Sequence, residues 1–209
     1  MINETVSQEA VLSRSFRTKI RIAQALNSLC EQTPYLKISA EAIAKKADIS
    51  RSGFYHHFAD KDAIVQWLTS MFYSYGVDQI GRSLTWFESY LATTRSFMHF
   101  RSLFVSEPEN VSYSSGRSFY IRHRLQTLRE TLTQYKHLDI SDLLAFQIEA
   151  LVHTEVAMTS KYFDQMDCTL KQFCDMMETA VPRELHDILA EPEEHVLLKG
   201  DFWISSGMS

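Results

Sequence analysis

Residues 38–61 read ISAEAIAKKADISRSGFYHHFADK, and this stretch predicts two short helices joined by a tight turn. Ser39 is a suitable N-cap because its hydroxyl can accept a hydrogen bond from the free amides of a first turn, and apolar residues then recur at helical spacing up to Ala47. Asp48 interrupts that pattern, and Ser50 supplies a second N-cap. The spacing therefore predicts a helix of about eight residues after Ser39 and a second short helix after Ser50.

The second of these helices separates apolar from polar side chains. Phe54 and Phe58 are four residues apart and therefore share one face. If those rings face the core, the side chains left pointing outward are Arg51, Ser52, Tyr55 and His56. Two small helices with a short turn and a polar second helix form a helix-turn-helix, whose second helix enters a DNA major groove.

The segment from Arg17 to Leu68 resembles the TetR family of transcriptional regulators, over about fifty of the 209 residues. The resemblance rests on Arg17-Thr18-Lys19-Ile20, Ala25-Leu26, Leu29, Ile38-Ser39, Ile43-Ala44, Ala47, Ile49-Ser50, Phe54-Tyr55-His56-His57-Phe58 and Lys61-Asp62-Ala63-Ile64. The most specific part of the resemblance is Phe54-Tyr55, then Phe58, then Lys61 at the start of the next helix. Two positions depart from the family, because Asp48 and Thr33-Pro34 each replace a usual glycine.

The resemblance implies an all-α chain with an N-terminal three-helix, helix-turn-helix DNA-binding domain and a C-terminal helical domain for ligand binding and dimerisation. It also implies a homodimeric repressor that a small molecule releases from a palindromic operator. Helical periodicity predicts further helices over 60–76, 83–94, 95–105, 117–135, 142–164 and 168–180. The expected organisation is a flexible tail (1–13), the DNA-binding domain (14–61), a connecting helix (62–80), the effector and dimerisation domain (81–190) and a C-terminal tail (191–209).

Side-chain chemistry predicts how the second helix of the motif contacts DNA. Arg51 can donate two hydrogen bonds to O6 and N7 of guanine, and Ser52 and His56 can reach base edges. Gly53, on the same helix, is included in the DNA-binding set. By resemblance, the positions that contact phosphate are Ser39, Tyr55, His57 and Lys61. The alternative is that the two histidines are surface residues with no role in DNA binding.

The charge of the chain is unevenly distributed. Residues 14–61 hold nine basic and four acidic side chains, a local charge of +5, and since the whole chain carries −5, the remainder carries −10. Four of the basic residues cluster where the first helix begins, which the helix dipole disfavours and nearby phosphates would explain: Arg14, Arg17, Lys19 and Arg21. This asymmetry is typical of a nucleic-acid-binding domain on an acidic partner domain, although a solvated basic face is the alternative.

Composition and motifs exclude several other classes of protein. The cysteines Cys30, Cys168 and Cys174 are odd in number and lack a CxxC spacing, which favours a reduced, cytoplasmic chain. The N-terminus has no apolar core typical of a signal peptide, and no stretch of eighteen apolar residues predicts a membrane span. The sequence contains no GxSxG, P-loop, HExxH or GxGxxG motif, so we expect neither enzymatic activity nor a cofactor.

The region after residue 81 is rich in aromatic residues and predicts a pocket for an apolar effector. Such an aromatic-rich helical domain with a few polar groups could enclose a small molecule, although aromatics at helical spacing also fill an ordinary core. The candidate pocket residues are Trp86, Phe87, Tyr90, Phe100, Phe104, Tyr120, Phe146 and His153.

The helices predicted over 142–164 and 168–180 are apolar on more than one face, which a second copy of the chain could cover. In TetR-like proteins the corresponding pair forms a four-helix bundle across a two-fold axis. The resemblance therefore implies a dimer interface that contains Leu151, Val152, Phe173 and Met177.

Two alternatives remain for how the protein responds to a signal. Glu149 and His153 share a helix face, and with His186, His195 and the cysteines they raise the possibility of a zinc-responsive regulator, although no spacing matches a dedicated zinc motif. For His153 with Glu149 and Glu155, a satisfied core or interface pair is favoured over an acid/base catalytic site. The other alternative is a TetR-like activator that works through a protein partner.

Overall fold

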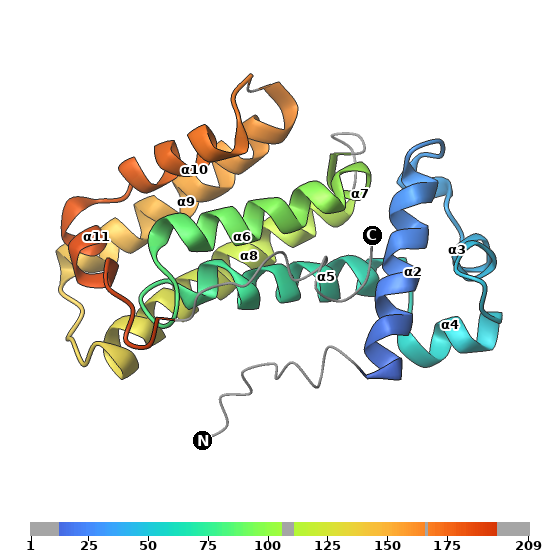
Figure 1. Cartoon of the computed structure of the whole chain (residues 1–209), viewed down its shortest axis with the longest axis horizontal. Coiled ribbons are helices and arrows are strands. Elements are labelled where there is room, and N and C mark those ends of the chain that lie inside the picture. The colour runs from blue at the N-terminus through green and yellow to red at the C-terminus, as the bar shows by residue number, and fades with distance from the viewer. Residues whose placement is uncertain (1–12, 106–110, 166, 196–209) are drawn as a thin grey trace. The chain divides into compact units, whose positions relative to one another are not determined.

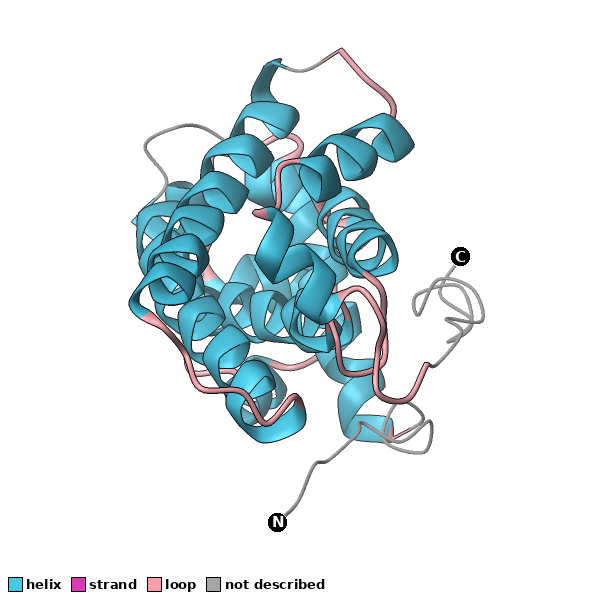
Figure 2. Ribbon diagram, turned by 90° about the vertical axis from the view of Figure 1, so that its left-hand side faces the viewer, coloured by secondary structure: helices cyan, strands magenta, loops and turns pink. Residues whose placement is uncertain are grey.

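The computed structural model of the 209-residue chain describes residues 13–105, 111–165 and 167–195 (Figure 1). Over these ranges the backbone forms helices and loops, with one isolated bridge between Ile80 and Leu84 and no strand (Figure 2). This confirms the predicted all-α fold. The α-helices are α2 (Arg14–Cys30), α3 (Ala40–Lys46), α4 (Arg51–His57), α5 (Lys61–Tyr75), α6 (Trp86–His99), α7 (Arg101–Val105), α8 (Val111–Glu130), α9 (Asp142–Gln165), α10 (Leu170–Thr179) and α11 (Arg183–Leu189).

The chain divides into two compact units, and the division falls inside α5. We call residues 13–68 with 100–105 and 111–112 the head, and residues 69–99 with 113–165 and 167–195 the body. Most of the predicted N-terminal tail and the end of the predicted C-terminal tail lie outside the described residues. Among the described residues, no helix combines the length and the apolar character that crossing a membrane requires.

Three serine side chains begin the first three helices of the head. The Oγ atom of Ser13 accepts a hydrogen bond from Phe16 N at 3.1 Å, that of Ser39 from Ala42 N at 3.1 Å, and that of Ser50 from Gly53 N at 2.9 Å. Each bond satisfies an amide that has no partner within its own helix, so the caps fix where α2, α3 and α4 start. The predicted caps at Ser39 and Ser50 are both confirmed.

The helices of the head pack around an apolar core. Helix α2 contacts α3, α4 and α7, and its inner face is buried. The short helix α7 is fixed to α2 by a hydrogen bond from Leu103 N to Asn27 Oδ1 at 2.9 Å. The core residues of the head come from every one of its helices and include Ile20, Leu26, Ile43, Ala44, Phe54, Phe58, Ile64, Leu68, Phe100 and Leu103.

The body has a second, separate core. Helix α10 packs against α6 and α9, and α11 packs against α9 (Figure 1). Gly76, which follows α5, allows a close approach to α6, because a Cβ atom there would lie 1.9 Å from Thr93 Oγ1. The main apolar residues of this core are Trp86, Tyr90, Tyr120, Leu128, Leu132, Ile148, Val152, Phe173, Met177 and Leu185.

Buried polar side chains tie the helices of the body together. Glu155 on α9 accepts hydrogen bonds from the hydroxyls of Tyr90 at 2.8 Å and Tyr120 at 2.5 Å, and it pairs with Arg124 at 3.2 Å. Arg124 also donates to the carbonyl oxygen of Val77 at 2.7 Å. The side chains of Arg124 and Glu155 are 1% and 2% exposed, so water does not solvate their charges. Hydrogen bonds among α6, α8, α9 and the loop after α5 take the place of that solvation.

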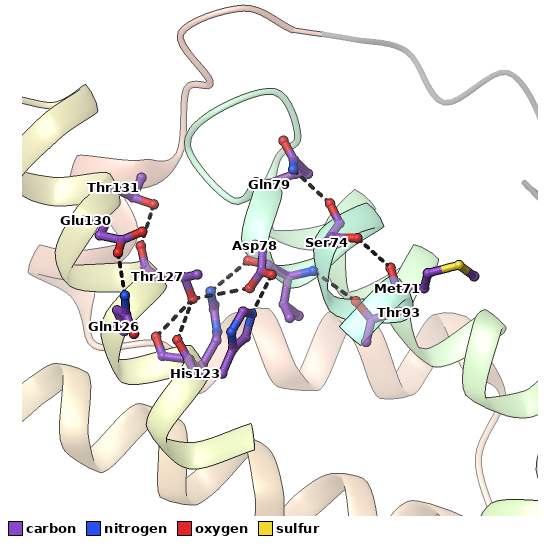
Figure 3. Close-up of polar contacts among 12 residues, drawn as sticks. Met71, Ser74, Asp78, Gln79, Thr93, His123, Gln126, Thr127, Glu130 and Thr131 are labelled. Atoms are coloured by element: carbon purple, nitrogen blue, oxygen red, sulfur yellow. Dashed lines mark hydrogen bonds and ion pairs between the residues drawn. The ribbon is translucent and has the colours of Figure 1, made fainter. Parts of the chain in front are cut away.

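A second polar cluster lies where α8 passes the loop after α5. The carboxylate of Asp78 is 2.7 Å from His123 Nε2 and accepts a hydrogen bond from Thr127 Oγ1 at 3.2 Å (Figure 3). Further along α8, Thr131 Oγ1 accepts from Arg82 Nε at 2.8 Å, at the start of the π-helical turn η3 (Thr131–Tyr135). These contacts anchor the loop between α5 and α6 to the side of α8.

Several body helices differ from the sequence prediction. Residues predicted as two helices over 83–94 and 95–105 instead form one continuous α6 and the separate short α7, with the break at Phe100. The final turn of the helix predicted over 117–135 is the π-helical η3, and α11 was not predicted. Pro182 is the N-cap of α11, where its missing amide hydrogen interrupts no hydrogen bond of the helix.

Candidate nucleic-acid interface

Helix α4 buries one aromatic residue and leaves a polar face outward. Phe54 is fully buried and Phe58, the C-cap, is also buried, whereas the exposed side chains of α4 are Arg51, Ser52, Tyr55 and His56. The two apolar rings therefore hold α4 against the head, as their four-residue spacing predicts. The Arg51 guanidinium lies 5.7 Å from the centre of the Tyr55 ring, so a cation and an aromatic group are adjacent on this face.

The turn between α3 and α4 is closed by a residue with left-handed backbone. Asp48 has φ 52°, and the following amide, Ile49 N, donates to Ala44 O at 3.0 Å. Aspartate adopts this conformation more readily than most residues, although at a cost that glycine avoids. The turn is thus closed with an aspartate in the left-handed position, and the exposed carboxylate of Asp48 lies beside the start of α4.

The end of α4 carries two adjacent histidines. The rings of His56 and His57 are 5.2 Å apart. The pKa of His57 lies below its usual value, first because the ring is partly desolvated and then because of the positive charges of His56 and Lys19. Lys19 itself lies 5.5 Å from the centres of both the Phe58 and Trp67 rings. The histidine end of α4 therefore lies close to the ammonium of Lys19, in the middle of α2.

Additional cations lie at the start of α2. Its first turn contains no acidic residue, and Arg14, Arg17 and Arg21 are all exposed. Ser39, at the start of α3, is exposed as well. Of the predicted phosphate-contacting residues, Ser39 and Tyr55 are therefore exposed, and His57 and Lys61 are partly exposed.

Lys61 does not project into solvent as the resemblance implied. Its ammonium donates to three backbone carbonyl oxygens, those of Tyr35 at 2.7 Å, Leu36 at 3.2 Å and Ile38 at 3.0 Å. The same nitrogen lies 4.6 Å from the centre of the Tyr35 ring. Because an ammonium group has three hydrogens to donate, its hydrogen-bonding capacity is used within the head.

The eight residues predicted to line an effector pocket have different surroundings in the structure. Trp86, Tyr90 and Tyr120 are buried in the body core, where the indole of Trp86 donates to His186 O at 3.3 Å and both tyrosines bond Glu155. Phe87 is partly buried against the same core.

The other four predicted pocket residues lie elsewhere. Phe100 and Phe104 belong to the head, because the chain breaks at Phe100 and α7 packs against α2. Phe146 is 71% exposed, and His153 on the same helix is also exposed. The pocket prediction grouped them by composition, which carries no information about which face of a helix each occupies.

The residues predicted for the dimer interface are buried within the single chain. Leu151, Val152, Phe173 and Met177 all belong to the core of the body. The apolar side chains that α9 and α10 expose are different ones: Leu143 (59% exposed), Phe146, Met158 and Met176 (45%). Helix α9 is thus apolar on two faces, whereas α10 exposes Met176 among polar side chains, and the predicted residues occupy the inner face of both helices.

The sequence reading missed the partners of Glu155. It grouped Glu155 with His153, yet the structure pairs this carboxylate with Arg124, Tyr90 and Tyr120 from other helices. His153 and Glu149 are exposed, and no three metal-binding side chains converge anywhere in the described ranges. No local pattern indicates these contacts, because they join residues more than thirty positions apart.

Three solved structures share this fold. The dihydroxyacetone kinase operon activator DhaS is 19% identical, with 83% of this chain and 98% of that chain covered at a TM-score of 0.60. A TetR transcriptional regulator from Streptococcus agalactiae is 20% identical (81% and 96% covered, TM-score 0.51), and Salmonella enterica GusR is 18% identical (85% and 98%, TM-score 0.51). At these identities the likeness shows the fold alone.

The sequence comparisons concern the head. A comparison with curated proteins finds no match. Residues 22–67, which include most of α2, all of α3 and α4 and the start of α5, match the family model described as bacterial regulatory proteins, tetR family. With its helix-turn-helix head and its all-helical body, the chain resembles the TetR family of transcriptional regulators, and the match to the family model extends over residues 22–67.

Proposed function

We propose that the protein binds a palindromic DNA operator as a homodimer, with one α4 helix of each subunit in a major groove. The observation that carries the proposal is the division of α4 into two faces. Phe54 fixes the helix to the core while Arg51, Ser52, Tyr55 and His56 face outward. A short helix with a capped N-terminus and an outward polar face can enter a groove without exposing its apolar core.

Each residue of this face has a proposed role. Arg51 at the start of α4 reads guanine, and Ser52 and His56 reach neighbouring base edges. Gly53 has no side chain, which lets the helix backbone approach the DNA closely. Tyr55, His57 and Ser39 contact phosphate, and the exposed arginines of α2 add attraction that does not depend on sequence.

Arg51→Ala tests base readout. The wild-type chain first selects its preferred duplex from a random library, and binding of that duplex and of a shuffled duplex is then measured. We expect the variant to lose about 1–3 kcal/mol on the selected duplex and little on the shuffled one. Arg122→Ala, which removes an exposed arginine of the body, is the matched control and should bind both duplexes like wild type. An Arg51 variant with undiminished preference for the selected duplex would contradict the assignment.

We propose that the second subunit covers the apolar side chains that α9 exposes, together with Met176 of α10. Leu143 and Phe146 are one helical turn apart and largely exposed, and apolar side chains of this size are usually covered by a partner. Phe146→Asp should therefore give a folded monomer in analytical ultracentrifugation. Ala157→Asp, at another exposed position of α9, tests how far the interface extends. A Phe146 variant that remains fully dimeric would move the interface to another surface.

We propose repression as the direction of control, because a dimer bound over an operator competes with RNA polymerase. Transcription in vitro from a promoter that carries the selected duplex distinguishes repression from activation. The structural relative DhaS is named as an activator. A repressor lowers transcript yield as protein is added, and an activator raises it.

Release by a small molecule is the remaining part of the proposal. The aromatic body supports it in composition, but Tyr90 and Tyr120 are already hydrogen-bonded, so an effector must bind other groups or displace these contacts. A screen for apolar metabolites that raise the melting temperature of the protein tests this part of the proposal. Each compound that does so is then added to the protein–DNA complex, and dissociation of the DNA is measured. Zinc and then a chelator are added to the same DNA-binding assay to distinguish a metal-responsive regulator from one that responds to an organic molecule. Only the DNA binding of a metal-responsive regulator should change on these additions.

A further inference from the structure

Lys61 and Asp62, the first two residues of α5, hold the loop between α2 and α3. The ammonium of Lys61 donates to the carbonyl oxygens of Tyr35, Leu36 and Ile38, at 2.7, 3.2 and 3.0 Å. The hydroxyl of Tyr35 donates to the Asp62 carboxylate, and the Tyr35 ring lies under the same ammonium. We call these five residues the clamp.

The position of the clamp along the chain gives it a specific effect. Its loop side ends at Ile38, immediately before the N-cap Ser39 of α3, and its helix side begins a few residues after α4 ends at His57. The clamp therefore joins the segment that enters the helix-turn-helix to the segment that leaves it. A displacement of the start of α3 relative to the start of α5 would therefore stretch these contacts.

The alternative for Lys61 is a direct contact with a DNA phosphate, which the resemblance implied. Such a contact would require the ammonium to give up hydrogen bonds to carbonyl groups at the end of the short 3-10 helix η1 (Tyr35–Lys37). A cation at the carbonyl end of a helical turn is electrostatically favourable, and a partly buried one is costly to uncover. The geometry favours Lys61 as a part of the head's framework.

We propose that Lys61 is a positioning residue for DNA recognition, which sets the orientation of α3 and α4 through the clamp and neutralises no phosphate. The inference rests on the proposed function, since it concerns how the same helices read DNA. Its consequence is that Lys61 supports binding to the correct sequence more than binding to DNA in general.

The test compares Lys61→Met with wild type on the selected duplex and on a shuffled duplex, over a range of salt concentrations. A phosphate contact contributes about 0.9 to the slope of log K against log salt for each subunit, and it acts on every sequence. Positioning predicts about a tenfold loss on the selected duplex, little change on the shuffled duplex and an unchanged slope. Circular dichroism confirms that the variant is folded at the assay temperature.

Other outcomes overturn the proposal in distinguishable ways. Equal losses on both duplexes with a reduced slope assign Lys61 to phosphate. Equal losses without a change of slope mean that the variant only lowers the amount of folded protein. Unchanged binding means that the clamp has no role in recognition. Binding of the selected duplex by the wild-type chain tests the proposed function independently of these outcomes, because it does not depend on the Lys61 variant.

Tyr35→Phe provides a second variant that changes no charge. It removes the hydroxyl that donates to Asp62 and keeps the buried ring, so the head should remain folded. Positioning predicts a loss of preference for the selected duplex in the same direction as Lys61→Met, again with an unchanged slope. Lys61→Arg keeps a cation with several donors and should recover part of the preference. If Tyr35→Phe retains the full preference for the selected duplex, the clamp is not the route by which Lys61 acts.

Discussion

The head and the body of this protein are stabilised in different ways. Among the described residues, the buried side chains of the head are apolar, whereas every buried polar or charged residue belongs to the body, including Asp78, Arg124, Thr127 and Glu155. The head begins its first three helices with serine caps and directs its charges to the surface. The body places a charge pair in its centre and satisfies it with contacts from other helices.

This difference follows from what each unit presents to its surroundings. A surface that binds DNA needs its cations solvated and accessible until phosphates replace the water, and a small apolar core is sufficient to hold it. A buried ion pair adds little net stability, but it can make one arrangement of helices lower in free energy than the alternatives that leave a charge unpaired. Our hypothesis is that Arg124 and Glu155 have this role. Substitutions that act separately on the two units can test the contrast.

The largest effect is expected at the centre of the body. Glu155→Leu leaves the buried Arg124 without its carboxylate, and removing one partner of a buried pair costs about 3–5 kcal/mol of unfolding free energy. Urea denaturation followed by circular dichroism measures it. Glu149→Leu, an exposed glutamate on the same helix, is the control and should change stability by less than about 0.5 kcal/mol. A small effect at Glu155 would mean that Arg124 finds other partners.

The next effect concerns close packing in the body. A Cβ atom at Gly76 would lie 1.9 Å from Thr93 Oγ1 and 2.9 Å from Ser89 O, so Gly76→Ala should cost about 1–3 kcal/mol by overpacking. In the head, a Cβ at Gly53 would meet only Ser50 Oγ at 3.2 Å and Ile49 Cβ at 3.8 Å. Gly53→Ala should therefore change the melting temperature much less than Gly76→Ala. The reverse order would contradict the packing described here.

A smaller loss is expected when a cap of the head is removed. Ser50→Ala takes away the acceptor for Gly53 N and should cost about 1 kcal/mol, and it should also weaken DNA binding because α4 frays at the end that carries Arg51. Ser52→Ala, two residues later and exposed, is the matched control for stability. Thermal unfolding of both variants provides the comparison, and equal melting temperatures would show that the cap adds nothing.

The smallest effect is a pH dependence in the head. The pKa of His57 in the folded state lies below its value of about 6.5 in the unfolded state. The neutral ring therefore contributes fully to the free energy of unfolding above about pH 6.5, and this contribution is lost as the pH falls through the folded-state pKa. We expect the unfolding free energy to decline slightly more between pH 7.5 and 5.5 for wild type than for His57→Gln. His153→Gln, which changes an exposed histidine of the body, is the control. Identical pH profiles for wild type and His57→Gln would exclude this contribution.

The contrast between the units also explains which predictions succeeded. The caps at Ser39 and Ser50 and the buried Phe54 follow from interactions within a few residues, and the structure contains all of them. The pocket and interface residues depended on which face of a helix meets which neighbour. There the prediction placed Phe146 inside the body and Leu151 at its surface, and the structure has them the other way round.

The sequence by itself determined the helix-turn-helix, because capping, helical spacing and turn conformation are local properties that residues 38–61 carry without help from the rest of the chain. It also determined the all-helical class of the body through its periodicity. Only the tertiary structure decided that Lys61 turns inward to the loop before α3 and that Glu155 joins Tyr90, Tyr120 and Arg124. The physical reason is that a long polar side chain can bond water or many partners equally well, and the choice depends on groups that folding brings close from distant positions.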